Sequence, residues 1–420
     1  MCQGVKETET TGLVCYRVGG CVRDALLGLP VGERDWVVLG ETPEGMLARG
    51  FRRVGAAFPV FLHPVSGEEY ALARTESKSG RGYKGFAVNA APGITLEEDL
   101  FRRDLTINAM AMDAAGRVID PHGGRRDLEL RRLRHVSAAF ADDPLRVLRV
   151  ARFQARFAGL GFTVDPATLE MMKIITRSGE LSDLAVERIW QESLKALESD
   201  APAEYFRVLA RCGALERLFP ELHALRGKIH SPVHHPEGDA FEHVLWTLDR
   251  AVRLTSDPVI RFAALTHDLG KGLTPEVELP HHHGHDERGV AVVTELCHRL
   301  RIAKSFERLA ALVAGQHMRC HRVLEMRPGK VLGLLETLDA LRRPEQLERF
   351  LLACSADARH GEFPGVYPAG EALRLALRAA LSVDASALIG RGLAGPALGQ
   401  ALRQERIRRV KHALHGQGTA

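Results

Sequence analysis

Two carboxylates stand two positions apart at the start of an apolar run. Glu33 and Asp35 precede the stretch 36–39, Trp-Val-Val-Leu, which is typical of a buried strand. Alternate residues of a strand point to the same face, so this pair can hold one or two Mg²⁺ ions. Such ions activate an attacking hydroxyl and stabilise a leaving phosphate group. The alternative is a solvated strand end whose charges are ordinary.

A glycine pair follows the first strand-like run of the chain. Gly19 and Gly20 separate the run 13–18 from a short predicted helix that ends at Gly28. Glycines in such a turn let backbone N–H groups approach a phosphate. Arg23 can pair with the same phosphates. The alternative is a tight turn without a ligand.

Charged and polar residues interrupt the segment Leu96–Met110, which we predict to be a helix. Thr106 and Asn108 fall where the buried face should lie, and this indicates a side that faces a ligand. The region 102–156 contains twelve arginines and no lysine against seven acidic residues. The overall composition hides this local positive charge, which is typical of a nucleic-acid or phosphate partner.

Another predicted helix, near 144–158, begins with Asp143 followed by proline, and this start explains Asp143 structurally. Its arginines fall largely on one side: Arg146, Arg149, Arg152 and Arg156. Cytosine and adenine present an amino donor beside a ring-nitrogen acceptor, whereas uracil and guanine present a carbonyl in place of the amino group. A fixed carboxylate with a guanidinium would therefore accept C and A and reject U and G. The alternative is a solvated basic face.

Histidines and aspartates recur through the predicted helical region 237–360. In order they are His243, His267, Asp268, His285, His317 and Asp357. Imidazoles and carboxylates from separate helices suit a divalent transition metal that keeps an open position for water. Metal-bound water is a nucleophile for phosphoester hydrolysis. Taken singly, each histidine has the alternative of an ordinary place in the core.

Composition narrows the class of protein. The chain has 420 residues, 45% of them hydrophobic, which allows roughly two to four domains. The net charge of +4 permits a nucleic-acid partner without requiring one. Seven scattered cysteines without a Cys-x-x-Cys pair indicate a reducing cytoplasm. No apolar run reaches the roughly 18 residues that span a membrane, and the polar N-terminus lacks a signal-peptide core, so we expect a cytoplasmic protein with no membrane partner.

Alternating strand-like and helix-like runs, followed by a mostly helical remainder, predict an α+β protein. Strands are expected at 13–18, 35–39, near 58–63, 69–74 and 117–120, and helices near 144–158, 166–178, 186–198 and 202–212. A basic stretch rich in Gly and Ser, 77–85, predicts a mobile loop. The expected parts are a disordered extension 1–12, an α/β head 13–137, a helical body 138–228, a histidine-rich helical domain 229–362 and a helical tail 363–420.

The motifs of the head together resemble a known family. They are Gly-Gly-x-Val-Arg-Asp-x-Leu-Leu-Gly at 19–28, the carboxylate-x-Asp at 33–35 and Arg-Arg-Asp-Leu-Thr-Ile-Asn-Ala at 102–109. Their order resembles the class II CCA-adding enzymes and bacterial poly(A) polymerases of the polymerase β superfamily. With the histidine region, the resemblance spans roughly residues 14–400 and is closest to the bacterial multifunctional CCA-adding enzymes, which are class II tRNA nucleotidyltransferases with an HD phosphohydrolase domain. It implies a polymerase β-type nucleotidyltransferase α/β head, then a mostly α-helical body that includes the HD domain.

The resemblance assigns roles to particular residues. The two Mg²⁺-binding aspartates of the family match Glu33 and Asp35, so position 33 carries one methylene more than usual. Glu69 matches the third acidic position, and 77–85 matches the flexible loop needed to add the final A. Positions that bind the nucleotide match Gly20, Arg23, Arg103, Asp143, Arg146, Arg149 and Arg152. Among these, the family's Glu-Asp-x-x-Arg motif reads the incoming base, and here Asp142 stands in for its Glu.

The HD pattern implies a metal, often Ni²⁺, held by His243, His267, Asp268 and Asp357, with His285 and His317 as weaker matches. The implied reaction is addition and repair of the 3′-terminal CCA of tRNA from CTP and ATP with release of pyrophosphate. Implied HD activities are 2′,3′-cyclic phosphodiesterase, 2′-nucleotidase and phosphatase. The tail residues Arg403, Arg406, Arg408, Arg409 and Lys411 are expected to contact tRNA phosphates, with a solvated helix as the alternative. Either a monomer or a homodimer fits the sequence.

Three other functions compete. A poly(A) polymerase shares the head motifs, but the segment 54–61 lacks the Gly-Arg-Arg-Phe of that branch, and an HD region is not expected there. A partial enzyme that adds only C conflicts with the intact loop 77–85, and an A-only enzyme stays open. An HD hydrolase whose weakened head merely binds RNA is favoured by Glu33 alone.

Overall fold

The computed structural model describes residues 10, 12–54, 59–78, 86–230, 238–358 and 363–415. The chain forms two compact units. The first comprises the described residues up to Ser193 together with Glu204–Leu218, and the second comprises Leu194–Ala203 and the described residues from Phe219 onward. Most of the expected N-terminal extension, and residues 79–85 of the expected loop, lie outside the described residues.

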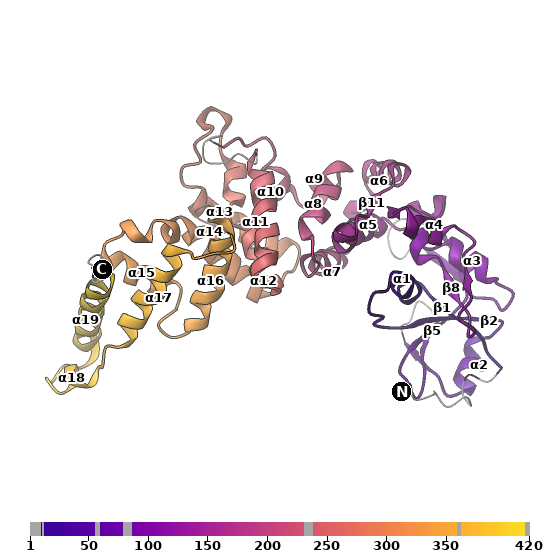
Figure 1. Ribbon diagram of the computed structural model, residues 1–420, viewed down its shortest axis with the longest axis horizontal. Helices are drawn as coiled ribbons and strands as arrows, with labels where there is room; N and C mark the ends of the chain where they lie inside the picture. The colour runs from indigo at the N-terminus through magenta and orange to yellow at the C-terminus, as the bar shows by residue number, and fades with distance from the viewer. Residues whose placement is uncertain are drawn as a thin grey trace. The chain divides into compact units, whose positions relative to one another are not determined.

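A mixed seven-stranded sheet forms the head (Figure 1), in the order β3-β4-β5-β2-β1-β8-β9. Its strands are β1 (Val14–Val18), β2 (Asp35–Leu39), β3 (Arg52–Val54), β4 (Val60–Leu62), β5 (Glu69–Leu72), β8 (Ala111–Met112) and β9 (Val118–Ile119). The strand β2 pairs antiparallel with β1 and parallel with β5, which places Asp35 opposite Glu69. A separate hairpin joins β6 (Thr75–Lys78) to β7 (Phe86–Asn89), so positions 77 and 78 are strand rather than the expected loop.

The central strand β2 is covered on both faces. Val37 belongs to one buried cluster with Leu100, and Val38 belongs to another with Met46. Burial on both sides explains why this strand reads as a continuous apolar run instead of an alternating one. The covering helices of the head are α1 (Gly20–Leu26), α2 (Pro43–Ala48), α3 (Leu96–Phe101) and α4 (Gly124–Glu129).

The predicted helix Leu96–Met110 is wrong beyond its first turns, since α3 ends at Phe101 and a short 3-10 turn, Thr106–Asn108, follows later. Asp99 is fully buried and accepts hydrogen bonds from Arg102 and Arg103, at 2.7 and 3.1 Å, and from a backbone N–H. Asp104 is buried too and accepts from its neighbouring backbone N–H. In a continuous helix the N–H of Leu105 would bond a backbone carbonyl, so its bond to the buried Asp104 carboxylate requires the helix to have ended before this point.

The rest of the first unit is helical and mostly where the sequence places it. Its elements, with the small two-stranded sheet, are β10 (Arg132–Leu133), α5 (Leu145–Phe157), β11 (Thr163–Val164), α6 (Pro166–Ser178), α7 (Val186–Leu197), α8 (Pro202–Arg211) and α9 (Ala214–Leu218), with the ends of α7 and α8 belonging to the second unit. Asp165 caps α6 and Gly179, at φ 81°, ends it. Local signals of this kind fix helix ends without tertiary help.

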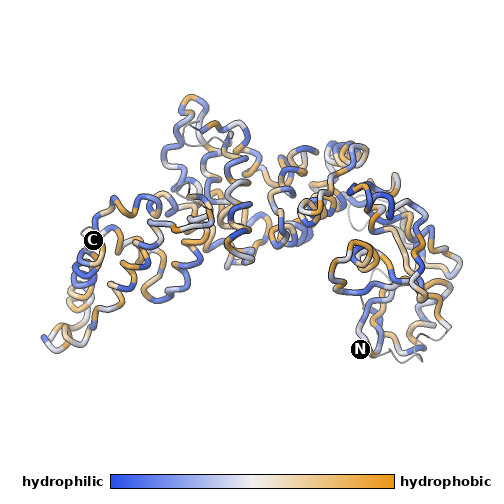
Figure 2. Tube along the Cα trace, in the orientation of Figure 1, coloured by the Kyte–Doolittle hydropathy of each residue, from blue (hydrophilic) through white to orange (hydrophobic). Residues whose placement is uncertain are grey.

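The second unit is a stack of helices. They are α10 (Pro220–His223), α11 (Ala240–Leu254), α12 (Pro258–Thr266), α13 (His285–Arg299), α14 (Lys304–His321), α15 (Pro328–Thr337), α16 (Pro344–Asp357), α17 (Pro368–Leu381), α18 (Ser386–Ile389) and α19 (Gly395–His415). The almost wholly buried α12 packs against α11, α14 and α16. Hydrophobic and hydrophilic residues alternate along these helices (Figure 2). No helix among the described residues is long and apolar enough to cross a membrane. The predicted α+β class, a head followed by a helical body, is confirmed.

Candidate active sites

A cavity of about 1130 Å³ opens in the first unit. Its lining contains the residues assigned above to Mg²⁺, to the third acidic position and to nucleotide binding: Gly20, Arg23, Glu33, Asp35, Glu69, Arg103, Asp143, Arg146, Arg149 and Arg152. Asp142, which stands in for the Glu of the base-reading motif, is not part of the lining. These lining residues come from the helix α1, the strands β2 and β5, the helix α5 and the segments just before β2, just after α3 and just before α5. The fold therefore brings together residues that are up to 132 positions apart in the sequence, counting from Gly20 to Arg152.

Acidic residues occupy one wall of this cavity. Asp35 opens β2 beside Glu69 of β5, and Glu33 precedes it. Desolvation by the surrounding protein raises the pKa of Asp35, the Arg103 guanidinium opposes that shift, and the charge of Glu33 adds to it. Carboxylates that line one cavity are the kind of ligand that a hard divalent cation such as Mg²⁺ prefers.

The glycine turn lies against Arg103. Gly19 has φ 74°, and a Cβ atom there would lie 3.2 Å from the Nη1 atom of Arg103. The Nη2 atom of Arg103 donates to Asp99 at 3.1 Å, while its Nε is buried without a hydrogen-bond partner. The positive φ requires glycine at position 19, and the absence of a side chain there leaves room for the Arg103 guanidinium.

Arg23 lines the cavity but is already held by the protein. It is only 3% exposed, donates from Nε to Asp24 at 2.8 Å and from Nη1 to the Oδ1 atom of Asn108, and lies 4.9 Å from the ring centroid of Phe157. Its assignment to the triphosphate stays a prediction. In this structure its contacts fix the position of α1 against the turn that carries Asn108.

The arginines of α5 are all paired. Arg146 donates to the carbonyls of Ala139 and Arg102, at 2.7 and 2.6 Å. The other pairs are Arg149 with Asp104 at 2.7 Å, Arg152 with Glu192 at 2.5 Å and Arg156 with Asp24 at 2.9 Å. Burial raises the pKa of Asp104, but the charge of Arg149, hydrogen bonds from Asn108 and Arg149 and the charge of Arg146 together hold that pKa below its ordinary value. The basic face is therefore not simply solvated, because it ties α5 to the head and to α7.

Asp143 accepts a hydrogen bond from the backbone N–H of Leu145 at 3.0 Å and another from Arg188 of α7 at 3.2 Å. The structure thus places Arg188, not Arg146, against this carboxylate. Sequence reasoning missed Arg188 and Glu192. Their i,i+4 spacing on one helix face is the only local signal that could have found them.

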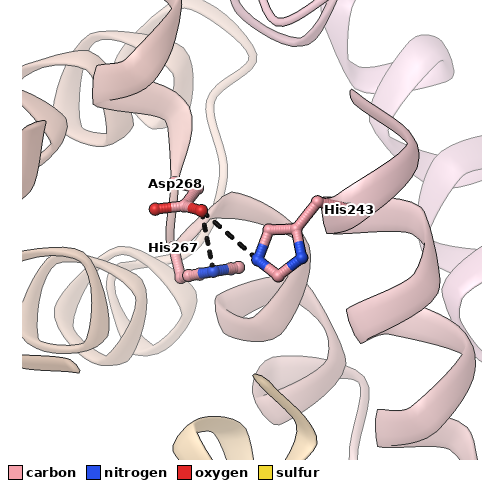
Figure 3. A group of neighbouring side chains, drawn as sticks. All are labelled: His243, His267 and Asp268. Atoms are coloured by element: carbon pink, nitrogen blue, oxygen red, sulfur yellow. Dashed lines mark ion pairs between the residues drawn. The ribbon is translucent and has the colours of Figure 1, made fainter. Parts of the chain in front are cut away.

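Imidazoles and carboxylates converge in the second unit (Figure 3). His243 comes from α11, His267 and Asp268 follow α12, and Asp357 ends α16. The Oδ2 atom of Asp268 lies 3.4 Å from His243 Nε2 and 3.2 Å from His267 Nε2. The Oδ1 atom of Asp357 lies 3.0 Å from His243 Nε2. The four residues predicted as metal ligands therefore share one buried centre.

Two further histidines complete the centre. The Oδ1 atom of Asp268 lies 3.3 Å from His285 Nε2 and 3.6 Å from His317 Nε2. Three sets of these donor atoms lie within 4.8 Å of one another: His243, His267 and Asp268; His267, His317 and Asp357; and Asp268, His285 and His317. Imidazole nitrogens therefore lie close to both carboxylate oxygens of Asp268.

Hydrogen bonds fix the ring tautomers. The Nδ1 atoms of His267, His285 and His317 lie 2.8, 2.7 and 3.0 Å from backbone carbonyl oxygens. A carbonyl only accepts, so each Nδ1 carries a proton and each Nε2 faces the centre. The Nε2 atoms of His285 and His317 lie 3.3 Å apart, at hydrogen-bond distance. Both nitrogens are placed where they could instead bind one cation.

Charge and burial agree with a cation site. Asp268 is buried, and its Oδ2 atom lies 2.5 Å from Lys271 Nζ and 3.2 Å from His267 Nε2. Burial raises the pKa of Asp268, but the charges of His267 and Lys271 together with hydrogen bonds from His243 and His267 hold that pKa well below its ordinary value. Burial lowers the pKa of His317 to about 3, so its ring stays neutral. Imidazole nitrogens that converge on buried carboxylates from separate helices fit a divalent transition metal.

Comparison with known proteins agrees with both sites. Family models match the poly A polymerase head domain at 15–134, a probable RNA-binding site of polymerase A at 161–226 and the HD domain at 240–361. A multifunctional CCA protein of Methylococcus capsulatus is 57% identical over 94% of each chain. Another, from Nitrosococcus oceani, is 54% identical over 95% of this chain and 98% of its own. The chain belongs to the multifunctional CCA protein family. It is a tRNA nucleotidyltransferase with an HD domain.

Solved structures of CCA-adding enzymes share the fold of this family member. The Thermotoga maritima enzyme complexed with tRNA aligns at a TM-score of 0.63, with 20% identity over 98% of this chain and 93% of that one. The Bacillus stearothermophilus enzyme in complex with CTP aligns at 0.60, with 25% identity over 98% and 91%. Both likenesses extend through the head and the helical body.

Sequence reasoning missed two residues at the HD centre. His321 donates from Nε2 to the Oδ2 atom of Asp357 at 2.8 Å, and Tyr367 lies 2.8 Å from His321 Nδ1. His321 follows His317 by one helical turn, and this i,i+4 spacing was the available signal. By contrast, His282 bonds Thr274 and a backbone carbonyl, outside the group of donors.

Proposed function

We propose that the cavity of the first unit catalyses template-independent addition and repair of the 3′-terminal CCA of tRNA, using CTP and ATP and releasing pyrophosphate. The convergence of the assigned metal-binding and nucleotide-binding residues on one cavity carries this proposal. The names of the relatives support it, as do solved CCA-adding enzymes complexed with tRNA, CTP and ATP. In this proposal Glu33 and Asp35 hold Mg²⁺, which supplies charge neutralisation at the transferred phosphate.

The protein's own residues perform the selection. Asp143 accepts from the amino group of cytosine or adenine, and Arg146 donates to the adjacent ring nitrogen. Arg188 supports that role by holding Asp143 at 3.2 Å. Gly20, Arg23, Arg103, Arg149 and Arg152 bind the rest of the nucleotide. Uracil and guanine present a carbonyl to a carboxylate, and this repulsion excludes them.

The test supplies a tRNA lacking CCA, with Mg²⁺ and all four nucleoside triphosphates, and sequences the product ends. We expect termination at CCA, and loss of addition in Asp35→Ala. Unchanged transfer by that variant would contradict the assignment of the head. Poly(A) tails, a single added residue or no addition would each support one of the rival functions.

We also propose that the HD centre is a phosphohydrolase that uses a divalent transition metal, Ni²⁺ by preference, on 2′,3′-cyclic phosphates, 2′-nucleotides and phosphomonoesters. The buried donors around Asp268 carry this proposal. His243, His267, Asp268 and Asp357 bind the metal, joined by His285 and His317. The metal supplies an activated water, and the buried donors exclude other solvent.

Hydrolysis of 2′,3′-cyclic AMP with Ni²⁺ tests this activity. We expect His267→Ala to abolish hydrolysis and to leave CCA addition intact, because the two sites belong to different units. Hydrolysis that survives His267→Ala would place the activity elsewhere.

The C-terminal tail is proposed to bind tRNA phosphates. Arg403 pairs with Glu336 at 2.9 Å, and Arg408 and Arg409 pair with Glu405, all at the surface. Exposed ion pairs are weak, so phosphates can replace the carboxylates. Replacing Arg408 and Arg409 by Ala should weaken tRNA binding and lower its salt dependence in a filter-binding assay.

A further inference from the structure

We propose that Tyr367 and His321 form a positioning relay that fixes the carboxylate of Asp357 for metal binding in the HD centre. This inference rests on the proposed metal-dependent function of that centre. Tyr367 lies beyond the matched HD domain, which ends at residue 361. The relay would make the segment before α17 a working part of the HD site.

The first observation is that the two oxygens of Asp357 have different partners. Oδ1 lies 3.0 Å from His243 Nε2 and 3.6 Å from His267 Nε2, on the side of the metal donors. Oδ2 accepts a hydrogen bond from His321 Nε2 at 2.8 Å. His321 therefore binds one oxygen and leaves the other to the centre.

The second observation is the direction of the hydrogen bonds. A carboxylate only accepts, so His321 Nε2 must carry a proton. In a neutral ring Nδ1 then accepts, and the hydroxyl of Tyr367 is its donor at 2.8 Å. Cys320 lies 3.3 Å from the same hydroxyl and can donate to its oxygen. Tyr367 thus selects the tautomer in which His321 donates to Asp357.

The third observation is that the backbone around Asp357 is held independently. Arg250 donates from Nε to the carbonyl of Ala356 at 2.7 Å and from Nη2 to that of Ala358 at 2.5 Å. Its guanidinium lies 4.3 Å from the Trp246 ring centroid. With the chain fixed by Arg250, what remains for His321 to set is the rotation of the Asp357 carboxylate.

Groups that orient a metal ligand typically change metal affinity or activity by roughly 10- to 100-fold when removed. We therefore expect His321→Leu to weaken Ni²⁺ binding by about that factor, measured by titration of the full-length protein against a competing chelator. His321→Gln should recover most of the loss, because its amide N–H can still donate to Asp357. A purely structural role would not distinguish these two variants.

A double-mutant cycle tests the connection through the ring. Tyr367→Phe should weaken Ni²⁺ binding in the wild type by a smaller factor than His321→Leu does. In the His321→Leu background it should have no further effect, because the imidazole that transmits the contact is gone. Hydrolysis of 2′,3′-cyclic AMP should show the loss in kcat more than in KM, since the proposed effect of Tyr367 acts through the bound metal.

Thermal unfolding of each variant serves as the folding control for the second unit, and CCA addition checks the first unit. If His321→Leu fails to fold, the comparison of Tyr367→Phe with the wild type still decides the question. Wild-type Ni²⁺ affinity in His321→Leu, or an equal loss from Tyr367→Phe in both backgrounds, would overturn the relay alone. Failure of the wild type to bind any divalent metal would overturn both the relay and the proposed hydrolase.

Discussion

Removing Arg149 should leave Asp104 charged and buried in the head. The pair is joined at 2.7 Å, with the Arg149 side chain 35% exposed and Asp104 only 7%. Removing one partner of a fully buried pair costs about 3–5 kcal/mol. Water reaches Arg149, and Asp104 keeps its hydrogen bonds from Asn108 and Leu105, so we expect Arg149→Met to cost about 2 kcal/mol.

The pH dependence identifies the cause. The pKa of Asp104 in the folded protein lies below its ordinary value, so the pair's stabilisation is present above the unfolded pKa, near 4, and is lost as pH falls through the lower folded value. In Arg149→Met, burial instead raises the pKa of Asp104, and protonation relieves the uncompensated charge. The deficit of the variant should therefore be largest at pH 7 and should shrink toward pH 4.5.

Hydrogen-exchange protection of the α5 backbone measures this effect in the intact protein. A cost of 2 kcal/mol corresponds to about a 30-fold loss of protection at pH 7. Adding Asp104→Asn to Arg149→Met should restore part of it, because the stranded charge disappears. An equal deficit at both pH values, or a larger one in the double variant, would refute the reasoning.

Three further predictions concern single residues. Asp35→Asn should lower transfer by more than about 10³-fold and leave the melting temperature and HD hydrolysis unchanged, because Asp35 is an exposed residue whose proposed role is metal binding. Primer extension and thermal unfolding measure these effects. A matching drop in melting temperature would argue against a purely catalytic loss. His285→Ala should lower Ni²⁺ affinity, whereas His281→Ala, at an exposed position, should not. Elemental analysis after gel filtration compares the metal content of the two variants with that of the wild type. Equal metal content in all three would exclude His285 as a ligand. Thr95→Ala removes the capping box of α3 and should cost about 1 kcal/mol in unfolding experiments, with Thr95→Ser as the control that keeps the cap.

Much of the fold follows from local signals. The strand Asp35–Leu39 and the helix Pro166–Ser178 were predicted with the bounds that the structure has, because each is delimited by residues whose backbone preference is strong. The helix Leu96–Met110 failed because the burial of Asp99 and Asp104 is a tertiary matter. The spacing of apolar residues cannot show that a carboxylate will be buried against an arginine 45 positions away, as Asp104 is.

The candidate sites, like the fold, could be predicted from the sequence only in part. Motif spacing identified the residues that line the cavity and the four central residues of the HD centre. It did not identify the residues that hold them, since Arg188 meets Asp143 across 45 positions and His321 meets Asp357 across 36. Such contacts are set by how helices pack, and one sequence does not contain that information in readable form.

The pairing of Arg149, Arg152 and Arg156 with carboxylates bears on what the cavity rejects. An anion that enters must compete with an internal carboxylate already in place, so chloride or inorganic phosphate gains little from exchanging with it. A nucleoside triphosphate carries more charge and reaches several guanidiniums at once. It can therefore displace several carboxylates in one binding event, whereas a small ion competes with one carboxylate at a time. The ion pairs that hold α5 in place therefore disfavour the binding of small anions in this strongly basic cavity.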